Sequence, residues 1–151
     1  MRINKPVIIL FIFLIIFNSQ VIAKGDLTKQ QPIEKTIFLG DKTNHLRFFP
    51  SVLSFETGKL YKLVIKNPSP QKHYFNARNL SDSVFTRKVQ VLNKNNSIIA
   101  EIKGTINEIE VYPGGTTEWW LVPVKTLHDS PLHCSISGHS EAGMTGKISI
   151  K

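Results

Sequence analysis

Cysteine is nearly absent from this chain of 151 residues, which holds one cysteine, Cys134, and two methionines. A single thiol cannot close an internal disulfide, so Cys134 is a free thiol, an intermolecular link or a metal ligand. The chain also lacks a run of lysines and arginines with interleaved aromatic residues, so its net charge of +8 does not indicate a nucleic-acid interface. No segment shows a sustained helical period, which argues against a helical domain.

The first 23 residues have the composition of a secretory signal peptide. A short basic stretch over 1–5 precedes an unbroken apolar run over 7–17, and Ala23 supplies a small residue at the expected cleavage point. The apolar run is shorter than the roughly 20 residues that a membrane-spanning helix needs. We therefore expect residues 1–23 to be removed on export to the periplasm, with no membrane insertion afterwards. The alternative is an uncleaved N-terminal anchor.

Short apolar runs separated by Gly, Pro and Asn fill the rest of the chain. After a polar lead-in over 24–35, these runs predict β-strands at 36–39, 46–55, 60–65, 73–75, 89–92, 97–102, 109–112, 116–124, 132–134 and 147–150. Residues 93–96 predict a hairpin turn, and residues 81–88 predict a helical turn. Many short strands at this spacing favour a single all-β domain over 36–151, an antiparallel sandwich or barrel.

The segment LHCSISGHSEAGMTG, residues 132–146, gathers three metal-binding side chains at even spacing. Cys134, His139 and Met144 form the pattern C-x4-H-x4-M, and thiolate, imidazole and thioether together suit copper. Electron-transfer copper sites combine two histidines, one cysteine and a distant axial methionine. A second histidine must come from elsewhere, and His73 is the best candidate because the strand and turn before it place it at the end of a predicted hairpin.

This ligand segment resembles that of cupredoxins, the type 1 copper family that includes plastocyanin, azurin and rusticyanin. The stretch YKLVIKNPSPQKHYF resembles the strand and turn before the family's upstream histidine, and EVYPGGTTEWWLVPV resembles the turn and strand before its cysteine. The resemblance covers residues 36–151 and implies a Greek-key β-sandwich of about eight strands. It also implies that the edge of His139 lies near the surface in an apolar patch, where electrons leave.

Two departures from the family's pattern concern the surroundings of the sulfur. Four residues separate Cys134 from His139, as in rusticyanin rather than plastocyanin. The family often has Asn or Ser beside the upstream histidine, where it tunes the cysteine sulfur, whereas Lys72 and Tyr74 flank His73 here. Hydrogen bonds around the sulfur help to set the reduction potential, so the resemblance does not fix that potential.

The enzymatic alternatives each lack a required residue. Multicopper oxidases carry His-Cys-His at the cysteine, whereas residues 133–135 read His-Cys-Ser and the chain has no His-x-His pair. The binuclear copper centre of oxidases needs two cysteines in one loop. A nucleophilic Cys134 with a histidine base leaves Met144 without a role, and no acid or oxyanion group accompanies it. We therefore expect no enzymatic activity, and expect the remaining histidines to be structural or superficial: His45, His128 and His133.

A periplasmic electron carrier with one type 1 copper ion is the function that the ligand pattern and the resemblance imply. His73, Cys134, His139 and Met144 would hold the copper, and the partners would be redox proteins such as cytochromes, oxidases or reductases. We expect a monomer. The alternative is a periplasmic copper-binding or tolerance protein that buffers or delivers copper. Met-rich or His-rich tails would favour that alternative, and the sequence has none.

Overall fold

The computed structural model describes residues 25–151, so the predicted signal peptide over 1–23 lies outside the described residues. Within that range no helix is both long and apolar enough to cross a membrane. In chain order, the elements are η1 (Leu27–Lys29), β1 (Ile33–Leu39), β2 (Phe48–Phe49), β3 (Val52–Phe55), β4 (Tyr61–Lys66), β5 (His73–Asn76), α1 (Arg78–Ser81), β6 (Val84–Leu92), β7 (Ile98–Ile102), β8 (Glu108–Val111), β9 (Thr116–Pro123), β10 (Leu127–His133) and β11 (Thr145–Ile150).

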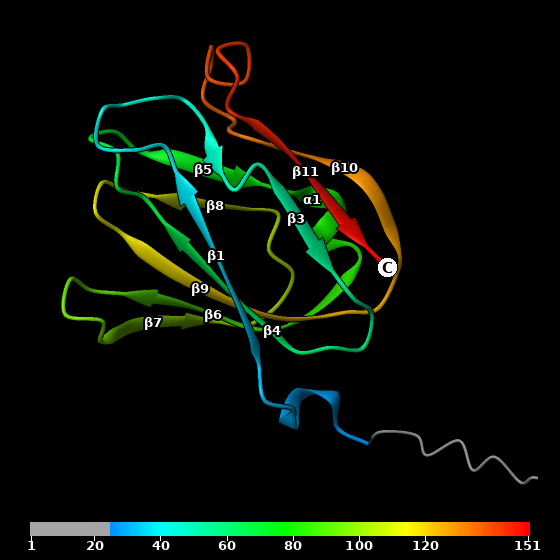
Figure 1. Ribbon diagram of the computed structural model, residues 1–151. Coiled ribbons are helices and arrows are strands. Elements are labelled where there is room, and N and C mark those ends of the chain that lie inside the picture. Colours follow the sequence, from blue (N-terminus) through cyan, green and yellow to red (C-terminus); the bar gives the residue numbers. More distant parts are fainter. Residues whose placement is uncertain (1–24) are drawn as a thin grey trace, which may run out of the picture.

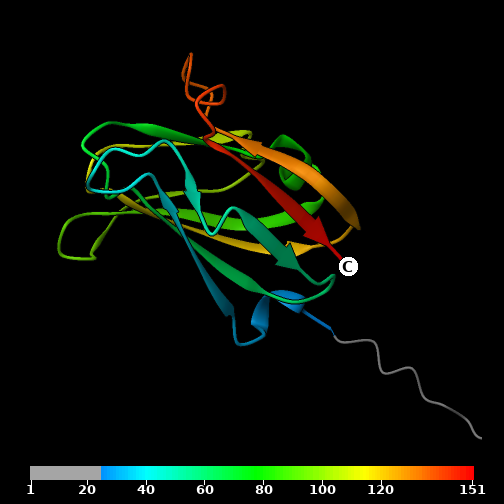
Figure 2. The ribbon, with the colours of Figure 1, turned by 45° about the horizontal axis from the view of Figure 1, so that its top comes forward.

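The strands form two sheets that pack against each other (Figures 1 and 2). One sheet has six strands in the order β2-β1-β4-β9-β6-β7, and the other has five in the order β3-β11-β10-β5-β8. One continuous cluster of buried apolar side chains draws on both sheets. The predicted all-β sandwich is confirmed.

The chain passes between the two sheets more often than the sequence suggested. The run predicted as one strand over 46–55 is two strands, of which β2 pairs with β1 and β3 pairs with β11 in the other sheet. Pro50 lies between them and has no amide hydrogen for a ladder, so it suits the point where the chain leaves one sheet for the other. Because of such crossings, β1 with β4 and β3 with β11 are parallel pairs. The expectation of wholly antiparallel sheets was wrong at these two pairs. The number of strand segments also exceeds the eight or so strands that the resemblance implied.

Two local predictions have different outcomes on β6. The helical turn expected over 81–88 was wrong for most of its length, because α1 ends at Ser81 and β6 begins at Val84. Pairing with β9 along the whole of β6 outweighs any local helical preference there. The hairpin turn over 93–96 is confirmed, since β6 and β7 pair antiparallel on either side of it. At the other end of the domain, β1 begins at Ile33, inside the predicted lead-in.

The core fixes the position of β5, the strand that carries His73. Side chains alternate along β5, so His73 and Phe75 point inward while their neighbours are partly exposed. Phe75 packs edge-on against Trp119 of β9 and Phe48 of β2, with ring centroids 6.4 Å apart in each pair. Aromatic contacts of this kind add about 0.5–1.5 kcal/mol each beyond the area they bury. His73 is therefore anchored two residues away from a well-packed aromatic cluster.

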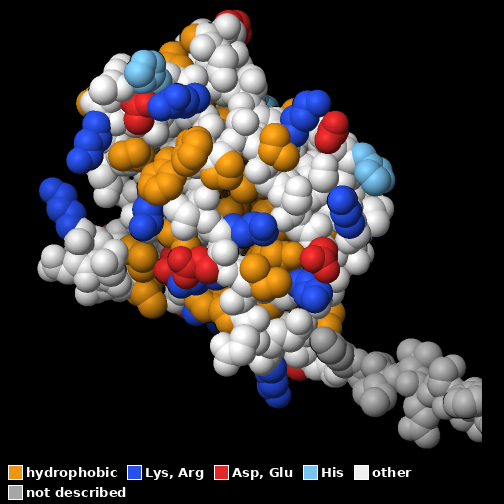
Figure 3. Space-filling view, viewed as in Figure 1, with side chains coloured by type: hydrophobic (Ala, Val, Ile, Leu, Met, Phe, Trp, Pro, Cys, Tyr) orange, Lys and Arg blue, Asp and Glu red, His pale blue; other side chains and the backbone are white. Residues whose placement is uncertain are grey.

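Charges on the surface are mixed. Figure 3 shows lysine and arginine side chains spread over one face of the molecule, with acidic side chains among them. Many of the lysines are paired with glutamates, as in Lys62 with Glu34 at 2.6 Å and Lys72 with Glu110 at 2.8 Å. The net positive charge is thus distributed rather than gathered on this face.

Candidate metal centre

His73 reaches the site by a different route from the predicted hairpin. The strand before it, β4, belongs to the six-stranded sheet, whereas β5 belongs to the five-stranded sheet. The segment 67–72 therefore crosses from one sheet to the other, and the hairpin expectation was wrong. Buried Asn67 holds this crossing, because its Nδ2 donates to the carbonyls of Gln71 at 2.8 Å and Val111 at 2.7 Å. His73 still lies at the end of the sandwich, as predicted from the sequence.

The other candidate ligands come from the connection between β10 and β11. Cys134 directly follows β10, and its amide donates to the carbonyl of Met144 at 3.2 Å, which closes the segment 134–144 into a loop. Inside it, the amide of His139 donates to Ile136 O at 3.0 Å and the amide of Met144 donates to His139 O at 2.9 Å. We call this segment the ligand loop. Its backbone bonds bend it so that His139 turns back over Cys134.

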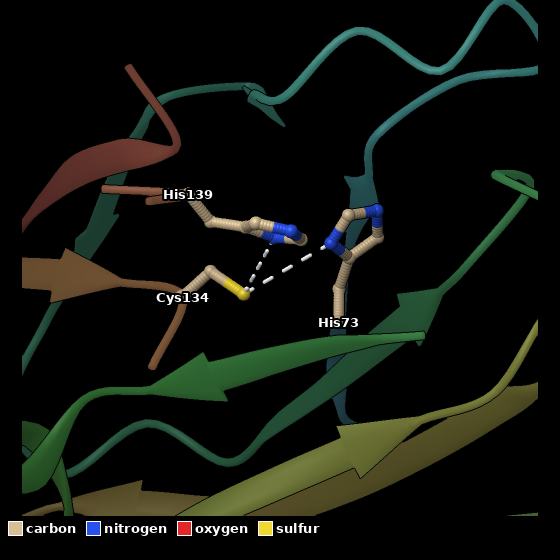
Figure 4. Close-up of side chains that lie close together, drawn as sticks. All are labelled: His73, Cys134 and His139. Atoms are coloured by element: carbon tan, nitrogen blue, oxygen red, sulfur yellow. Dashed lines mark hydrogen bonds between the residues drawn. The ribbon is translucent and has the colours of Figure 1, made fainter. Parts of the chain in front are cut away.

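Three of the four predicted ligands meet in one buried cluster (Figure 4). The Sγ atom of Cys134 lies 3.4 Å from Nδ1 of His139 and 3.9 Å from Nδ1 of His73. The two imidazole rings are 5.2 Å apart between centroids and inclined by 57°. His73 is 0% exposed, Cys134 is 1% exposed and His139 is 8% exposed. All three donor atoms lie within 4.8 Å of one another, a spacing at which one ion could touch each of them.

Met144 lies at the end of the ligand loop and is completely buried. Its backbone is joined to both Cys134 and His139 by the hydrogen bonds that close the loop. Its side chain belongs to the apolar core cluster, as Cys134 does. Its role as an axial ligand stays a prediction, and so does metal binding by the other three residues.

Burial gives His73 the protonation state that a metal ligand needs. Removal from water is the main cause that lowers the pKa of His73 to about 4, and the neighbouring His139 contributes to the same shift because a second positive charge would lie nearby. The ring is therefore neutral at physiological pH, with a free lone pair on one nitrogen. Imidazole binds metals in this form.

A backbone group donates a hydrogen bond to the sulfur. The amide of Tyr74 lies 3.3 Å from Sγ of Cys134 and donates to it. The side chain of Lys72 is directed to Glu110 instead, at 2.8 Å. The sequence drew attention only to the side chains beside His73, whereas this donor belongs to the backbone. Every residue except proline carries such an amide, so no residue type could have revealed it.

A polar cluster connects the first residue after Cys134 to two strands of the five-stranded sheet. Ser135 Oγ donates to Glu108 Oε2 at 2.8 Å, and Asn76 Nδ2 donates to the same carboxylate at 3.0 Å. Glu108 belongs to β8 and Asn76 to β5, so the start of the ligand loop is tied to both strands. The spacing of these residues in the sequence gave no indication of this cluster.

The remaining histidines lie outside the cluster, as the sequence predicted. His45 is exposed, with its Nδ1 2.9 Å from Oδ2 of Asp41. His128 is exposed, and His133 is half-buried in β10 beside Asn76 of β5. Within residues 25–151, the three-residue cluster is the one group of metal-binding side chains that the structure brings together.

Solved structures with a similar fold include copper proteins. A multicopper oxidase from Campylobacter jejuni shares 18% identity over 81% of this chain and 31% of its own chain, with a TM-score of 0.56. A copper-containing nitrite reductase from Thermus scotoductus SA-01 shares 14% identity over 81% and 32%, with a TM-score of 0.55. Auracyanin B shares 13% identity over 81% and 91%, with a TM-score of 0.50.

These likenesses establish the cupredoxin fold for this chain, and at such identities they establish the fold alone. The chain spans about a third of the oxidase and of the reductase, and most of auracyanin B. No family model matches the sequence, and no curated protein matches it. The expected Greek-key cupredoxin-like sandwich is thereby confirmed.

Proposed function

We propose that this protein binds one copper ion through His73, Cys134 and His139, with Met144 as a fourth and weaker ligand, and carries single electrons in the periplasm. One observation carries the proposal: a buried cysteine sulfur lies 3.4 Å and 3.9 Å from a ring nitrogen of each of two buried histidines. Thiolate with two imidazoles is the donor set of electron-transfer copper sites.

The chemistry of the donors and their burial fit copper. Bound copper would supply the one-electron Cu(I)/Cu(II) couple. His73 offers a neutral nitrogen, because burial lowers its pKa to about 4. The Cys134 thiol must lose its proton on binding, so uptake of the metal releases a proton. The amide of Tyr74 then stabilises the thiolate by donating to its sulfur.

A rigid frame supports the transfer of electrons. His73 is set in β5, and Cys134 directly follows β10, so two ligands are placed by paired strands of one sheet. A change of the metal's charge would therefore move these two ligands little. His139 has an exposed fraction of 8%, whereas His73 has none, so His139 offers the route to a redox partner such as a cytochrome.

An electron carrier is favoured over a copper buffer by the number of sites. Within residues 25–151 the structure brings together one group of metal-binding side chains, and that group is enclosed by the core. A buffer or delivery protein gains from several accessible sites, for which methionine-rich or histidine-rich tails are suited.

The first test is the visible spectrum of the metal-free protein after one equivalent of Cu(II) is added. We expect an intense sulfur-to-copper absorption band that Cys134→Ser abolishes, because the band requires the thiolate. His128→Gln, which changes an exposed histidine outside the cluster, should leave the band unchanged. If the wild-type protein gives no such band, the copper proposal is wrong.

A second test separates the carrier from the buffer. The copper-loaded protein is mixed with a reduced periplasmic cytochrome, and the band is followed with time. An electron carrier should lose its band by reduction and regain it on reoxidation, with copper retained throughout. Net loss of copper to a chelating acceptor, without electron exchange, would instead favour the buffer.

A further inference from the structure

The outer nitrogen of His73 is engaged by a side chain that the proposed function does not use. Nδ1 of His73 faces the sulfur of Cys134, and Nε2 lies 3.1 Å from Oγ of Ser69. His73 is 0% exposed and Ser69 is 2% exposed, so water does not compete with this contact. In this buried hydrogen bond one of the two atoms donates the hydrogen and the other accepts it.

Three further contacts determine that direction. The amide of Gln71 donates to Ser69 Oγ at 3.2 Å, and Ser69 Oγ donates its own hydrogen to Oδ1 of Asn44 at 3.2 Å. Gln71 Nε2 donates to the same Asn44 oxygen at 2.9 Å. A hydroxyl has one hydrogen and two lone pairs. Ser69 Oγ donates its hydrogen to Asn44, and one of its lone pairs accepts from the amide of Gln71. Only the second lone pair remains, so Ser69 Oγ accepts a hydrogen bond from Nε2 of His73.

We propose that Ser69 and Asn44 are positioning residues that fix His73 as the Nε2–H tautomer and so present its Nδ1 lone pair to the metal. This inference rests on the proposed copper site. The neutral imidazole carries one hydrogen, and the hydrogen bond at one nitrogen decides which nitrogen is left to bind. Partners of this type commonly contribute a factor of about 10–100 in metal affinity.

The surroundings of Ser69 explain how the hydroxyl is held still. The amide of Ser69 donates to Oδ1 of Asn67 at 2.9 Å, and Asn67 is itself 1% exposed. On the other side, a Cβ atom placed on Gly40 would lie 3.0 Å from both His73 Nε2 and Ser69 Cβ. The imidazole and the hydroxyl are thus enclosed between the crossing segment and Gly40, which leaves little room for His73 to flip.

The test reads the tautomer directly in the metal-free protein. Nitrogen-15 NMR of the histidine rings should show His73 as a single Nε2–H tautomer in the wild-type protein. Ser69→Ala should bring in a population of the Nδ1–H form and weaken Cu(II) binding by about tenfold or more in a chelator competition. The matched control is Ser81→Ala, which removes another buried hydroxyl, one without a hydrogen-bond partner among the described residues.

A second pair of variants changes Asn44, an exposed residue that takes part in the same contacts. The test therefore does not require that Ser69→Ala folds. Asn44 has a φ of +64°, which glycine, asparagine and aspartate tolerate best. Asn44→Gly should raise the Nδ1–H population, whereas Asn44→Asp keeps an oxygen acceptor and should retain the wild-type tautomer.

Two results would overturn the inference. One is an Nδ1–H tautomer in the wild-type protein. The other is a Ser69→Ala protein whose tautomer and Cu(II) affinity match those of Ser81→Ala. A wild-type protein with the expected tautomer but no copper binding would show a different failure. It would overturn the proposed function and the metal-binding part of the inference together, while the hydrogen bonds of His73 would stand.

Discussion

His73 and His139 approach the same sulfur from two regions that are built differently. The upstream region, residues 67–76, is held by contacts with distant parts of the chain, such as Asn67 with Val111 and Phe75 with Trp119. The ligand loop is held mainly by backbone bonds between its own residues, and only its first part is tied to the sheet, through Ser135. One histidine is therefore fixed by the whole sandwich, and the other by a short local turn.

This difference assigns the two regions different tasks. Contacts with distant segments hold His73 in place, so it cannot move without disturbing the core. His73 therefore defines the geometry of the site. The exposed part of the ligand loop, around Gly138, can be changed without disturbing the sheets, and His139 lies nearer to solvent than His73 does. Equivalent changes in the two regions should therefore have unequal effects.

The largest effect is expected from a pair of glycine substitutions, one beside each histidine. Gly40 and Gly138 both have a positive φ, +71° and +83°. A Cβ on Gly40 would press against His73 and Ser69, whereas Gly138 has open space around it. Both alanine variants should lose about 1–2 kcal/mol from the left-handed backbone, and Gly40→Ala should lose about 1–3 kcal/mol more from overpacking.

Urea denaturation of the metal-free proteins measures these losses. Gly40→Ala should also alter the copper spectrum more than Gly138→Ala does. Equal losses in the two variants would show that the upstream region is no more tightly packed than the ligand loop.

The free energy of unfolding should depend on pH by up to about 3.5 kcal/mol because of His73 in the upstream region. The pKa of His73 is about 4 in the folded protein, against an ordinary value of 6.5. Between these values the unfolded chain binds the proton and the folded chain does not, so stability falls as pH falls from about 6.5 towards 4. Each unit of pKa shift is worth about 1.4 kcal/mol, which sets the upper bound.

The free energy of unfolding of the metal-free protein, measured at several pH values, checks this prediction. His73→Gln has no titrating ring at that position and should lose less stability over the same range. Parallel pH curves for the two proteins would contradict an assignment of the effect to His73.

The smallest effect on stability is expected from Met144→Leu in the ligand loop. Leucine has a similar volume, so the metal-free protein should lose less than about 1.5 kcal/mol. With copper bound, the visible band should remain and the reduction potential should rise, because a hydrocarbon in place of the thioether disfavours the more highly charged Cu(II). An unchanged potential would mean that Met144 serves only the core.

The same contrast between regions explains what could be predicted from the sequence. Cys134, His139 and Met144 lie within eleven consecutive residues, so their spacing alone indicated one site. His73 lies 61 residues before Cys134, and no local pattern joins the two. The sequence supported His73 only through the fold that it was expected to adopt, and its proposed hairpin was wrong even though its place at the site was not.

Residues that act through hydrogen bonds were not predictable at all. Ser69 and Asn44 are 25 residues apart and belong to different loops. Tyr74 donates through its backbone, which has no residue-specific pattern. Such contacts depend on which loops meet at one end of the sandwich.

By itself, the sequence determined the all-β class, through alternating apolar runs and turn residues, and the local half of the candidate site. Alternation and spacing involve residues that are only a few positions apart, so they can be recognised in the sequence itself. Tertiary structure decided the rest: the crossings between sheets, the parallel pairs and the contacts that fix His73. Those features depend on burial and pairing between distant segments, and these exist only once the two sheets have closed on a common core.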